Sequence, residues 1–187
     1  SDATARGGYY LVRHLAKDLG LNGLRIAVQG FGNAGYHFAR LARERGYRIV
    51  ALSDSQGAIY AADGLDPDPI WRHKHKNREL KGMVYCDESV CQEADVEQLT
   101  NEELLALDVD VLVLAALEDA VTEQNAATVN AATILEIANG PVSNAADDQL
   151  AKRGVEVLPD VLVNAGGVIV SHLEWVQNRI GDTWSED

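Results

Sequence analysis

Three glycines within residues 30–35 have the spacing that lets a backbone turn hold a phosphate group. The hexapeptide Gly30-Phe31-Gly32-Asn33-Ala34-Gly35 fits the pattern G-x-G-x-x-G, directly after an apolar run of strand length and at the start of a helical pattern. In that context the first glycine makes a tight turn, the second lets a pyrophosphate approach the backbone, and the third lets helix and strand pack closely. The motif predicts a dinucleotide-binding turn whose helix N-terminus receives the pyrophosphate.

A second candidate is Asp54, which ends the next apolar run, residues 47–53. It lies 19 positions beyond Gly35, close to the ~20 expected for an acidic residue that hydrogen-bonds a ribose 2′-hydroxyl. An aspartate there favours NAD over NADP, because a 2′-phosphate would meet a like charge; the alternative is an Asx turn that ends the strand. The cation-rich residues 71–78 are interpreted as a solvated helix face, with folding back toward a 2′-phosphate as the alternative.

The elements that must position these residues alternate between strand and helix patterns. This alternation predicts an α/β fold of the Rossmann-like type, doubly wound, with a mostly parallel sheet and helices on both faces. One domain is expected over residues 1–187, with residues 1–20 forming a helix that packs on it. Residues 57–69 are predicted as loop. Strands are predicted over 24–29, 47–53, 109–114, 133–138 and 155–158, and helices over 36–45, 101–107 (N-cap Thr100, capping box with Glu103), 123–130 (N-cap Thr122), 145–153 (N-cap Asn144) and 167–179.

Composition narrows the classes of function. Hydrophobic residues make up 47% of the chain and charged residues 24%, which fits a folded globular domain. The net charge of −13 repels polyanions, so neither a nucleic acid nor a membrane surface is expected as a partner. No apolar run has the length of a membrane span, and a cytoplasmic location is expected.

Cys86 and Cys91 are expected to be reduced thiols. His73 with His75 makes a poor metal site, so we expect no metal.

Further motifs occur in a fixed order from one end of the chain to the other. They are Ala3-Thr4-Ala5-Arg6-Gly7, Ser53-Asp54-Ser55, Asp63-Gly64-Leu65, Ala115-Ala116-Leu117-Glu118, Ala138-Asn139-Gly140-Pro141, Leu158-Pro159-Asp160, Asn164-Ala165-Gly166-Gly167-Val168 and Glu174-Trp175-Val176-Gln177-Asn178. Together with the glycine turn, these motifs resemble the glutamate dehydrogenases, in the cofactor-binding half of that family. The resemblance implies that the residues that bind the dinucleotide are Thr4, Gly30, Gly32, Asn33, Ala34, Gly35, Asp54, Ser55, Ala115, Ala116, Asn139 and Asn164.

The resemblance also assigns roles to individual positions. Thr4 matches the residue that hydrogen-bonds the nicotinamide carboxamide, and Asn164 matches the asparagine near the nicotinamide and the substrate amino acid group. Val168 and Ser171 match positions that face the substrate side chain, and a hydroxyl at Ser171 suits the γ-carboxylate of glutamate. The family's catalytic lysines follow Gly-Gly pairs in an N-terminal substrate domain. None of the five lysines here does so, hence no catalytic residue is expected in this chain.

The expected function follows from this resemblance. The chain is expected to be the dinucleotide-binding domain of an NAD-dependent glutamate dehydrogenase, with NADP as the alternative cofactor, and to bind cofactor without catalysis on its own. The parent enzyme would oxidatively deaminate L-glutamate to 2-oxoglutarate and ammonia and assemble as a homo-hexamer, whereas the fragment would be a monomer or weak dimer. The alternatives are the same domain of a leucine, valine or phenylalanine dehydrogenase, and a free-standing nucleotide-binding module without catalysis.

Overall fold

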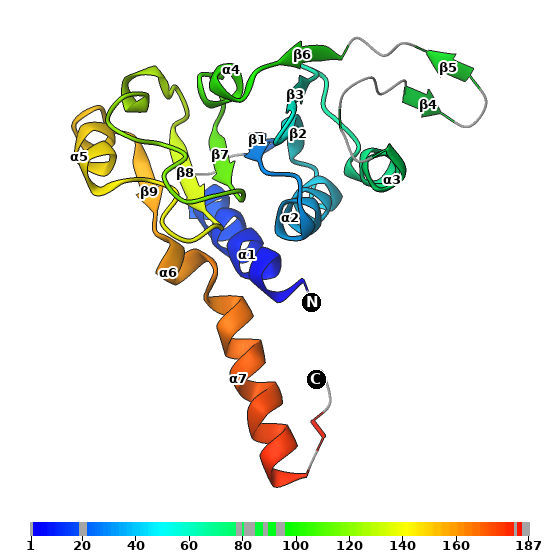
Figure 1. Cartoon of the computed structure of the whole chain (residues 1–187), viewed down its shortest axis with the longest axis vertical. Coiled ribbons are helices and arrows are strands. Elements are labelled where there is room, and N and C mark those ends of the chain that lie inside the picture. The colour runs from blue at the N-terminus through cyan, green and yellow to red at the C-terminus, as the bar shows by residue number, and fades with distance from the viewer. Residues whose placement is uncertain are drawn as a thin grey trace.

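The computed structural model describes residues 2–18, 22–77, 80, 85–87, 90–92, 96–181 and 183–184. Its centre is a seven-stranded sheet in the order β6-β3-β2-β1-β7-β8-β9 (Figure 1). The five strands β2, β1, β7, β8 and β9 run parallel, and at one edge β3 pairs antiparallel with both β2 and β6. The strands are β1 (Arg25–Gln29), β2 (Arg48–Asp54), β3 (Gly57–Tyr60), β6 (Glu97–Leu99), β7 (Val111–Leu114), β8 (Thr133–Glu136) and β9 (Glu156–Leu158), with β4 (Tyr85–Asp87) and β5 (Val90–Gln92) forming a separate pair.

Helices cover both faces of the large sheet, which confirms the predicted doubly wound α/β fold. Alternate strand residues point to opposite faces: Ile26 and Val28 of β1 pack with the helices of one face, and Ala27 packs with those of the other. The first face carries α1, α2 and α3, and the second carries α4, η1 and α5. The helices are α1 (Ala3–Asp18), α2 (Asn33–Glu44), α3 (Pro67–Asn77), α4 (Asn101–Leu105), α5 (Asn144–Lys152), α6 (Asp160–Val163) and α7 (Ala165–Ile180), with the 3-10 helix η1 (Ala126–Thr128).

Two predicted segments differ in the structure. Residues 57–69, predicted as loop, contain β3, because Ala58 and Ile59 are buried and pair with β2 across a two-residue turn. The same segment also contains the start of α3, which begins at Pro67. The helix predicted over 123–130 is wrong: only a 3-10 turn forms there. The side chain of Asn125 accepts a hydrogen bond from the Thr122 N–H (2.8 Å) and donates to the Ala120 carbonyl (3.0 Å), so Thr122 caps no helix.

Two smaller corrections concern helix starts. The N-cap of α5 is Ser143, whose hydroxyl accepts the Ala146 N–H (3.2 Å), and Asn144 is already the first helical residue. The predicted capping box at Thr100 and Glu103 is confirmed at the start of α4. The side chains of Cys86 and Cys91, expected to be reduced thiols, lie outside the described part of the structure.

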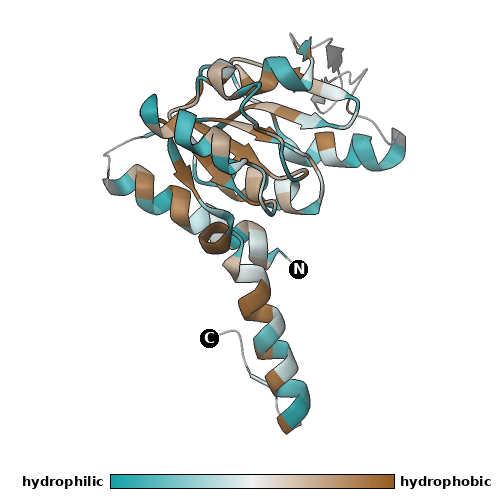
Figure 2. Ribbon diagram, turned by 60° about the vertical axis from the view of Figure 1, so that its left-hand side comes forward, coloured by the Kyte–Doolittle hydropathy of each residue, from teal (hydrophilic) through white to brown (hydrophobic). Residues whose placement is uncertain are grey.

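The last helix, α7, extends away from the sheet and its covering helices (Figure 1). None of its residues is buried, although it contacts α1 near its first turn. Hydrophobic segments alternate with hydrophilic ones along the ribbon of this helix (Figure 2). Its exposed apolar residues include Val168, Ile169, Leu173 and Trp175. Among the helices that the structure describes, none combines the length and apolar character needed to cross a bilayer.

Candidate dinucleotide site

The glycine turn between β1 and α2 has the geometry that its sequence predicts. Gly30 has a φ of 93°, and a Cβ there would lie 2.7 Å from the carbonyl carbon of Ala115. A Cβ at Gly35 would collide with the carbonyl oxygen of Gly30, so α2 packs directly on the turn. At Gly32, by contrast, no atom other than those of its own residue and its two chain neighbours lies within 4 Å of an added Cβ. The turn is therefore tightly packed behind Gly30 and Gly35 and open in front of Gly32, at the N-terminus of α2.

Ser53 supports this turn from the neighbouring strand. This role was not predicted from the sequence. It is fully buried near the end of β2, and its hydroxyl accepts the Gly30 N–H (3.3 Å). Its carbonyl oxygen accepts the Phe31 N–H (2.6 Å). A polar residue in an otherwise apolar strand was the available signal. Because both bonds come from one residue, the turn is fixed relative to the end of β2.

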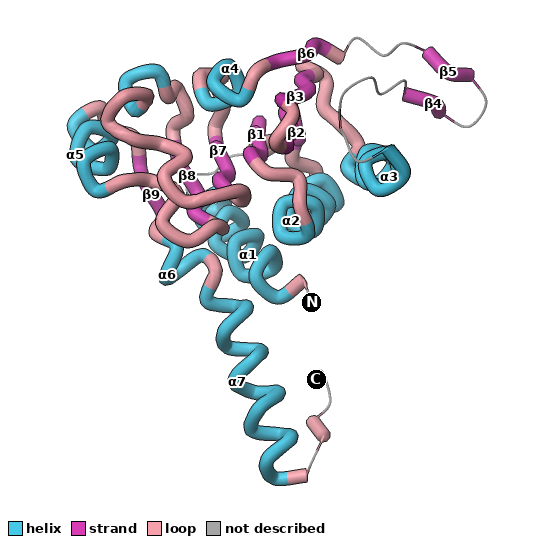
Figure 3. Tube along the Cα trace, in the orientation of Figure 1, coloured by secondary structure: helices cyan, strands magenta, loops and turns pink. Residues whose placement is uncertain are grey.

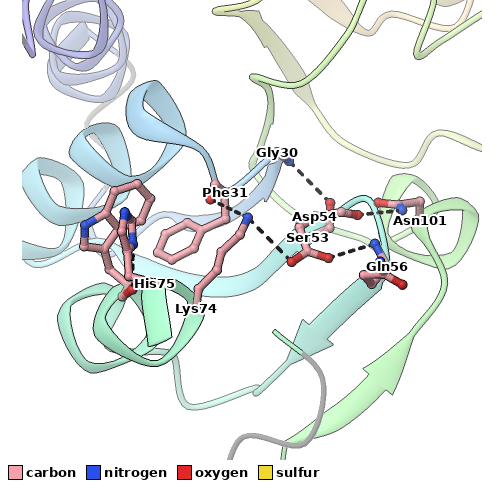
Figure 4. Close-up of polar contacts among 9 residues, drawn as sticks. Gly30, Phe31, Ser53, Asp54, Gln56, Lys74, His75 and Asn101 are labelled. Carbon is pink, nitrogen blue, oxygen red and sulfur yellow. Dashed lines mark hydrogen bonds and ion pairs between the residues drawn. The ribbon is translucent and has the colours of Figure 1, made fainter. Parts of the chain in front are cut away.

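Asp54 lies at the carboxyl end of β2 beside the turn (Figure 4). One carboxylate oxygen accepts the Gln56 N–H (2.8 Å), and the other lies 3.5 Å from the Lys74 ammonium group. Lys74 also donates to the Phe31 carbonyl oxygen (2.8 Å). The ammonium group therefore joins α3, the glycine turn and the end of β2.

This contact corrects the interpretation of residues 71–78 as a solvated helix face. Lys74 is only 21% exposed, while its neighbours Arg72 and Lys76 are exposed as predicted. The packing of α3 gives the reason: the Trp71 ring stacks on Tyr36 of α2, with ring centroids 4.3 Å apart. This stacking holds α3 against α2, and Lys74 then reaches the turn.

Next to Asp54 is a cavity of about 390 Å³ that is also lined by Ser55 and by the first residues of α4. Asn101 of α4 donates its side-chain amide to the Asp54 carbonyl oxygen (3.0 Å), which ties α4 to the end of β2 (Figure 4). Asp54 and Ser55, predicted as binding residues, thus share one cavity.

Two more cavities lie beside the loop that follows β8, and one of them also borders the loop that follows β7. Figure 3 draws both loops in pink. One, of about 400 Å³, brings Ala34 of the glycine turn together with Ala115, Ala116 and Asn139. The other, of about 450 Å³, is lined by Thr4, Asn139, Asn164, Val168 and Ser171. Because both cavities share Asn139, they adjoin. The structure therefore places the predicted residues in a row, along the edge formed by the carboxyl ends of the parallel strands.

Two asparagines face each other where these cavities meet. The Asn164 side-chain amide donates to the Asn139 side-chain oxygen (2.7 Å) and, at 3.4 Å, to the Ile137 carbonyl oxygen. Glu136, the last residue of β8, is buried close to them in sequence and was not singled out from the sequence. Burial raises the pKa of Glu136, and hydrogen bonds from the backbone N–H groups of Asp160 and Val142 partly oppose this shift.

The crevice at the carboxyl ends of the strands is where open α/β sheets bind ligands, at the point where the strand order reverses. Here that point lies between β1 and β7, beside the glycine turn. Fold and site together define an α/β domain with a candidate ligand crevice at the carboxyl ends of its parallel strands. The family model described as glutamate/leucine/phenylalanine/valine dehydrogenase matches residues 1–187, and the chain belongs to this family.

The relatives to which this chain is similar include glutamate dehydrogenases of both cofactor specificities. The chain is 50% identical over 185 residues to an NADP-specific glutamate dehydrogenase of Synechocystis, covering 98% of this chain and 43% of that protein. It is 40% identical to an NAD-specific glutamate dehydrogenase of Bacillus subtilis, covering 99% of this chain and 41% of that protein. Among solved structures, a hetero-hexameric glutamate dehydrogenase of Thermus thermophilus superposes with a TM-score of 0.85 at 35% identity, covering 98% of this chain and 41% of that one. The chain therefore spans about two fifths of the length of these relatives.

Proposed function

We propose that the chain is the dinucleotide-binding domain of a glutamate dehydrogenase. The observation that carries this proposal is the turn at Gly30–Gly35, where open space in front of Gly32 adjoins the N-terminus of α2. A helix N-terminus attracts an anion through its backbone N–H groups and its dipole. This matters in a chain of net charge −13, because the turn attracts the pyrophosphate without a cluster of basic side chains.

The remaining residues fit the rest of a dinucleotide. The N–H groups of Asn33 and Ala34 would donate to the pyrophosphate, and Asp54 would accept from the adenosine ribose. Thr4, Asn139 and Asn164 would hold the nicotinamide end in the 450 Å³ cavity that they line. When bound, the nicotinamide ring supplies the hydride acceptor. The protein orients that ring against the substrate and excludes water.

For the cofactor, we propose that NAD is preferred and NADP accepted. Asp54 would repel a 2′-phosphate, but Lys74 lies 3.5 Å from the same carboxylate and offsets its charge. Relatives of both specificities are consistent with a site balanced in this way, because one similar enzyme is NADP-specific and another NAD-specific.

For the substrate, we propose glutamate, with Ser171 and Val168 facing its side chain from α7. Groups that act as acid or base would come from another domain of a longer parent protein. The exposed apolar side chains of α7 support this arrangement, since a large exposed apolar surface is typical of an interface. Measuring the parent enzyme on a panel of amino acids tests the substrate: glutamate is expected to be oxidised faster than leucine, valine or phenylalanine, and the reverse order would contradict the role of Ser171.

The binding proposal is tested by titrating NADH into the purified chain and into Gly32→Asp. Aspartate is a favourable N-cap residue, so the variant is expected to be at least as stable to heat as the original chain. Its carboxylate would lie where the pyrophosphate approaches, and NADH affinity should fall at least about tenfold. Unchanged NADH affinity in a folded Gly32→Asp chain would refute the assignment of the turn.

Catalysis by the isolated chain gives a separate check. Because the proposed acid and base belong to another domain, we expect NADH binding with no glutamate oxidation. Measurable reduction of NAD by the purified chain in the presence of glutamate would show that catalytic groups lie within residues 1–187. If the chain binds no dinucleotide at all, the proposed function itself is wrong.

A further inference from the structure

Glu136 has an unusual position for an acidic residue. It ends β8, is only 6% exposed, and uses both carboxylate oxygens as hydrogen-bond acceptors. One oxygen accepts the Val142 N–H (3.2 Å) and the other accepts the Asp160 N–H (2.9 Å). A single buried side chain thus connects the loop after β8 to the start of α6.

Asp160 continues this connection toward the candidate site. Its side chain accepts the Gly140 N–H (2.8 Å), which adds a second link between α6 and the loop after β8. The two segments joined in this way carry Asn139 and Asn164, whose side chains hydrogen-bond to each other at 2.7 Å. Both asparagines line the 450 Å³ cavity, whereas Glu136 does not. Glu136 therefore acts on the cavity only through the backbone that it holds.

The chemistry of the two bonds requires the carboxylate. Two N–H groups point at Glu136, and an ionised carboxylate accepts at both oxygens. An amide in the same place would turn an NH₂ donor toward one of the N–H groups and lose that bond. Burial makes ionisation costly and so raises the pKa of Glu136, and the two N–H donors partly offset that cost.

We propose that Glu136 is a positioning residue for the nicotinamide half of the cofactor: it fixes the loop after β8 against the start of α6, and so sets Asn139 and Asn164 in place. This inference rests on the proposed function. Glu136 lines none of the three cavities of the candidate site, so it would act without touching the cofactor. Its influence is confined to one end of the site, because the glycine turn and Asp54 are held by separate contacts from Ser53, Lys74 and Asn101.

The test compares NADH with ADP, which shares its adenosine half but lacks the nicotinamide ribose and ring. NADH and ADP are titrated by calorimetry into the 187-residue chain and into Glu136→Gln. The variant should bind NADH at least about fivefold more weakly and ADP within about twofold of the original chain. The change in nicotinamide fluorescence on NADH binding should decrease in parallel. Glu156→Gln, at an exposed glutamate on the adjacent strand β9, is the matched control and should bind both ligands normally.

A second variant keeps the inference testable if Glu136→Gln does not fold. Asp160→Asn keeps the side-chain shape but weakens the link to Gly140, and the same selective loss of NADH affinity is expected from it. Equal weakening of both ligands, or no weakening of either in the folded variants, would overturn the inference while leaving the proposed function intact. Binding of neither ligand by the original chain would refute the proposed function and the inference with it.

Discussion

Asp54 and Lys74 form the ion pair on which we expect cofactor choice to depend. The pair is partly buried, with side chains 7% and 21% exposed, so solvent and salt screen it less than a surface pair. In the proposed complex, the 2′-position of the adenosine ribose lies beside these two groups. A 2′-phosphate would be repelled by one group and attracted by the other, whereas a 2′-hydroxyl needs only an acceptor.

Removing either partner should shift the ratio of NADPH to NADH dissociation constants in opposite directions. In Lys74→Met, Asp54 is left unpaired, and the ratio should rise about tenfold, equivalent to ~1.4 kcal/mol. In Asp54→Asn, Lys74 is left to attract the phosphate, and the ratio should fall by a similar factor. Fluorescence titration with both cofactors measures the ratio, in which any general effect on the turn cancels.

Lys76→Met is the control for the lysine variant, because Lys76 is exposed on the same helix and its loss changes the net charge equally. Its cofactor ratio should match that of the original chain. If Lys74→Met and Asp54→Asn shifted the ratio in the same direction, the pair would not lie at the 2′-position.

Among the secondary-structure elements, α4 shows how a short helix supports the site. Thr100 accepts the Glu103 N–H (3.1 Å), and Glu103 accepts the Thr100 N–H (2.7 Å). This capping box fixes the start of α4, and the next residue, Asn101, holds the end of β2.

Loss of the cap should therefore destabilise the fold. Thr100→Ala removes the hydroxyl acceptor and should lower the free energy of unfolding by about 1 kcal/mol, measured by urea denaturation. Thr100→Ser keeps the hydroxyl and should retain most of that stability. A loss in the serine variant as large as that in the alanine variant would mean that the cap does not stabilise α4.

The strands and helices that could be predicted from sequence are those with a strong local signal. Apolar runs in the sequence predicted the parallel strands, and the spacing of Thr100 and Glu103 predicted the start of α4. The segments that differ depend on contacts that spacing does not show. The Arg153 guanidinium donates hydrogen bonds to two backbone carbonyl oxygens around η1, those of Ala126 and Val129. The strand β3 exists because Ile59 is buried against β2.

The residues of the candidate site also fall into two groups, those that could be predicted from the sequence and those that could not. The glycine turn and Asp54 could be predicted, because the chemistry of a pyrophosphate and a ribose fixes residue types and spacing along the chain. Glu136 could not be predicted, and Ser53 and Lys74 gave only weak signals, a polar residue in an apolar strand and a cation-rich segment. Each acts through a contact with a segment more distant in sequence or through burial of a polar group. These supporting residues depend on the tertiary structure.

In the molecule as a whole, the proposed cofactor lies along one edge of the sheet. The three cavities near Asp54, Ala115 and Asn164 all lie at the carboxyl ends of the parallel strands. A competing cavity of about 420 Å³ lies at the opposite end of β2, lined by Arg48 and Gly64 among others. It contains none of the predicted binding residues. Binding of NADH at one edge of the sheet can therefore be distinguished from binding at the other.

The most direct test is to map NADH binding by the backbone amide NMR shifts of the labelled chain. We predict that the largest changes fall on residues 30–35, with further changes at Ala115, Ala116, Asn139 and Asn164, because these residues lie along the proposed binding edge. Changes concentrated around Arg48 and Gly64, or a spectrum unaffected by saturating NADH, would contradict the assignment of this edge as the dinucleotide site.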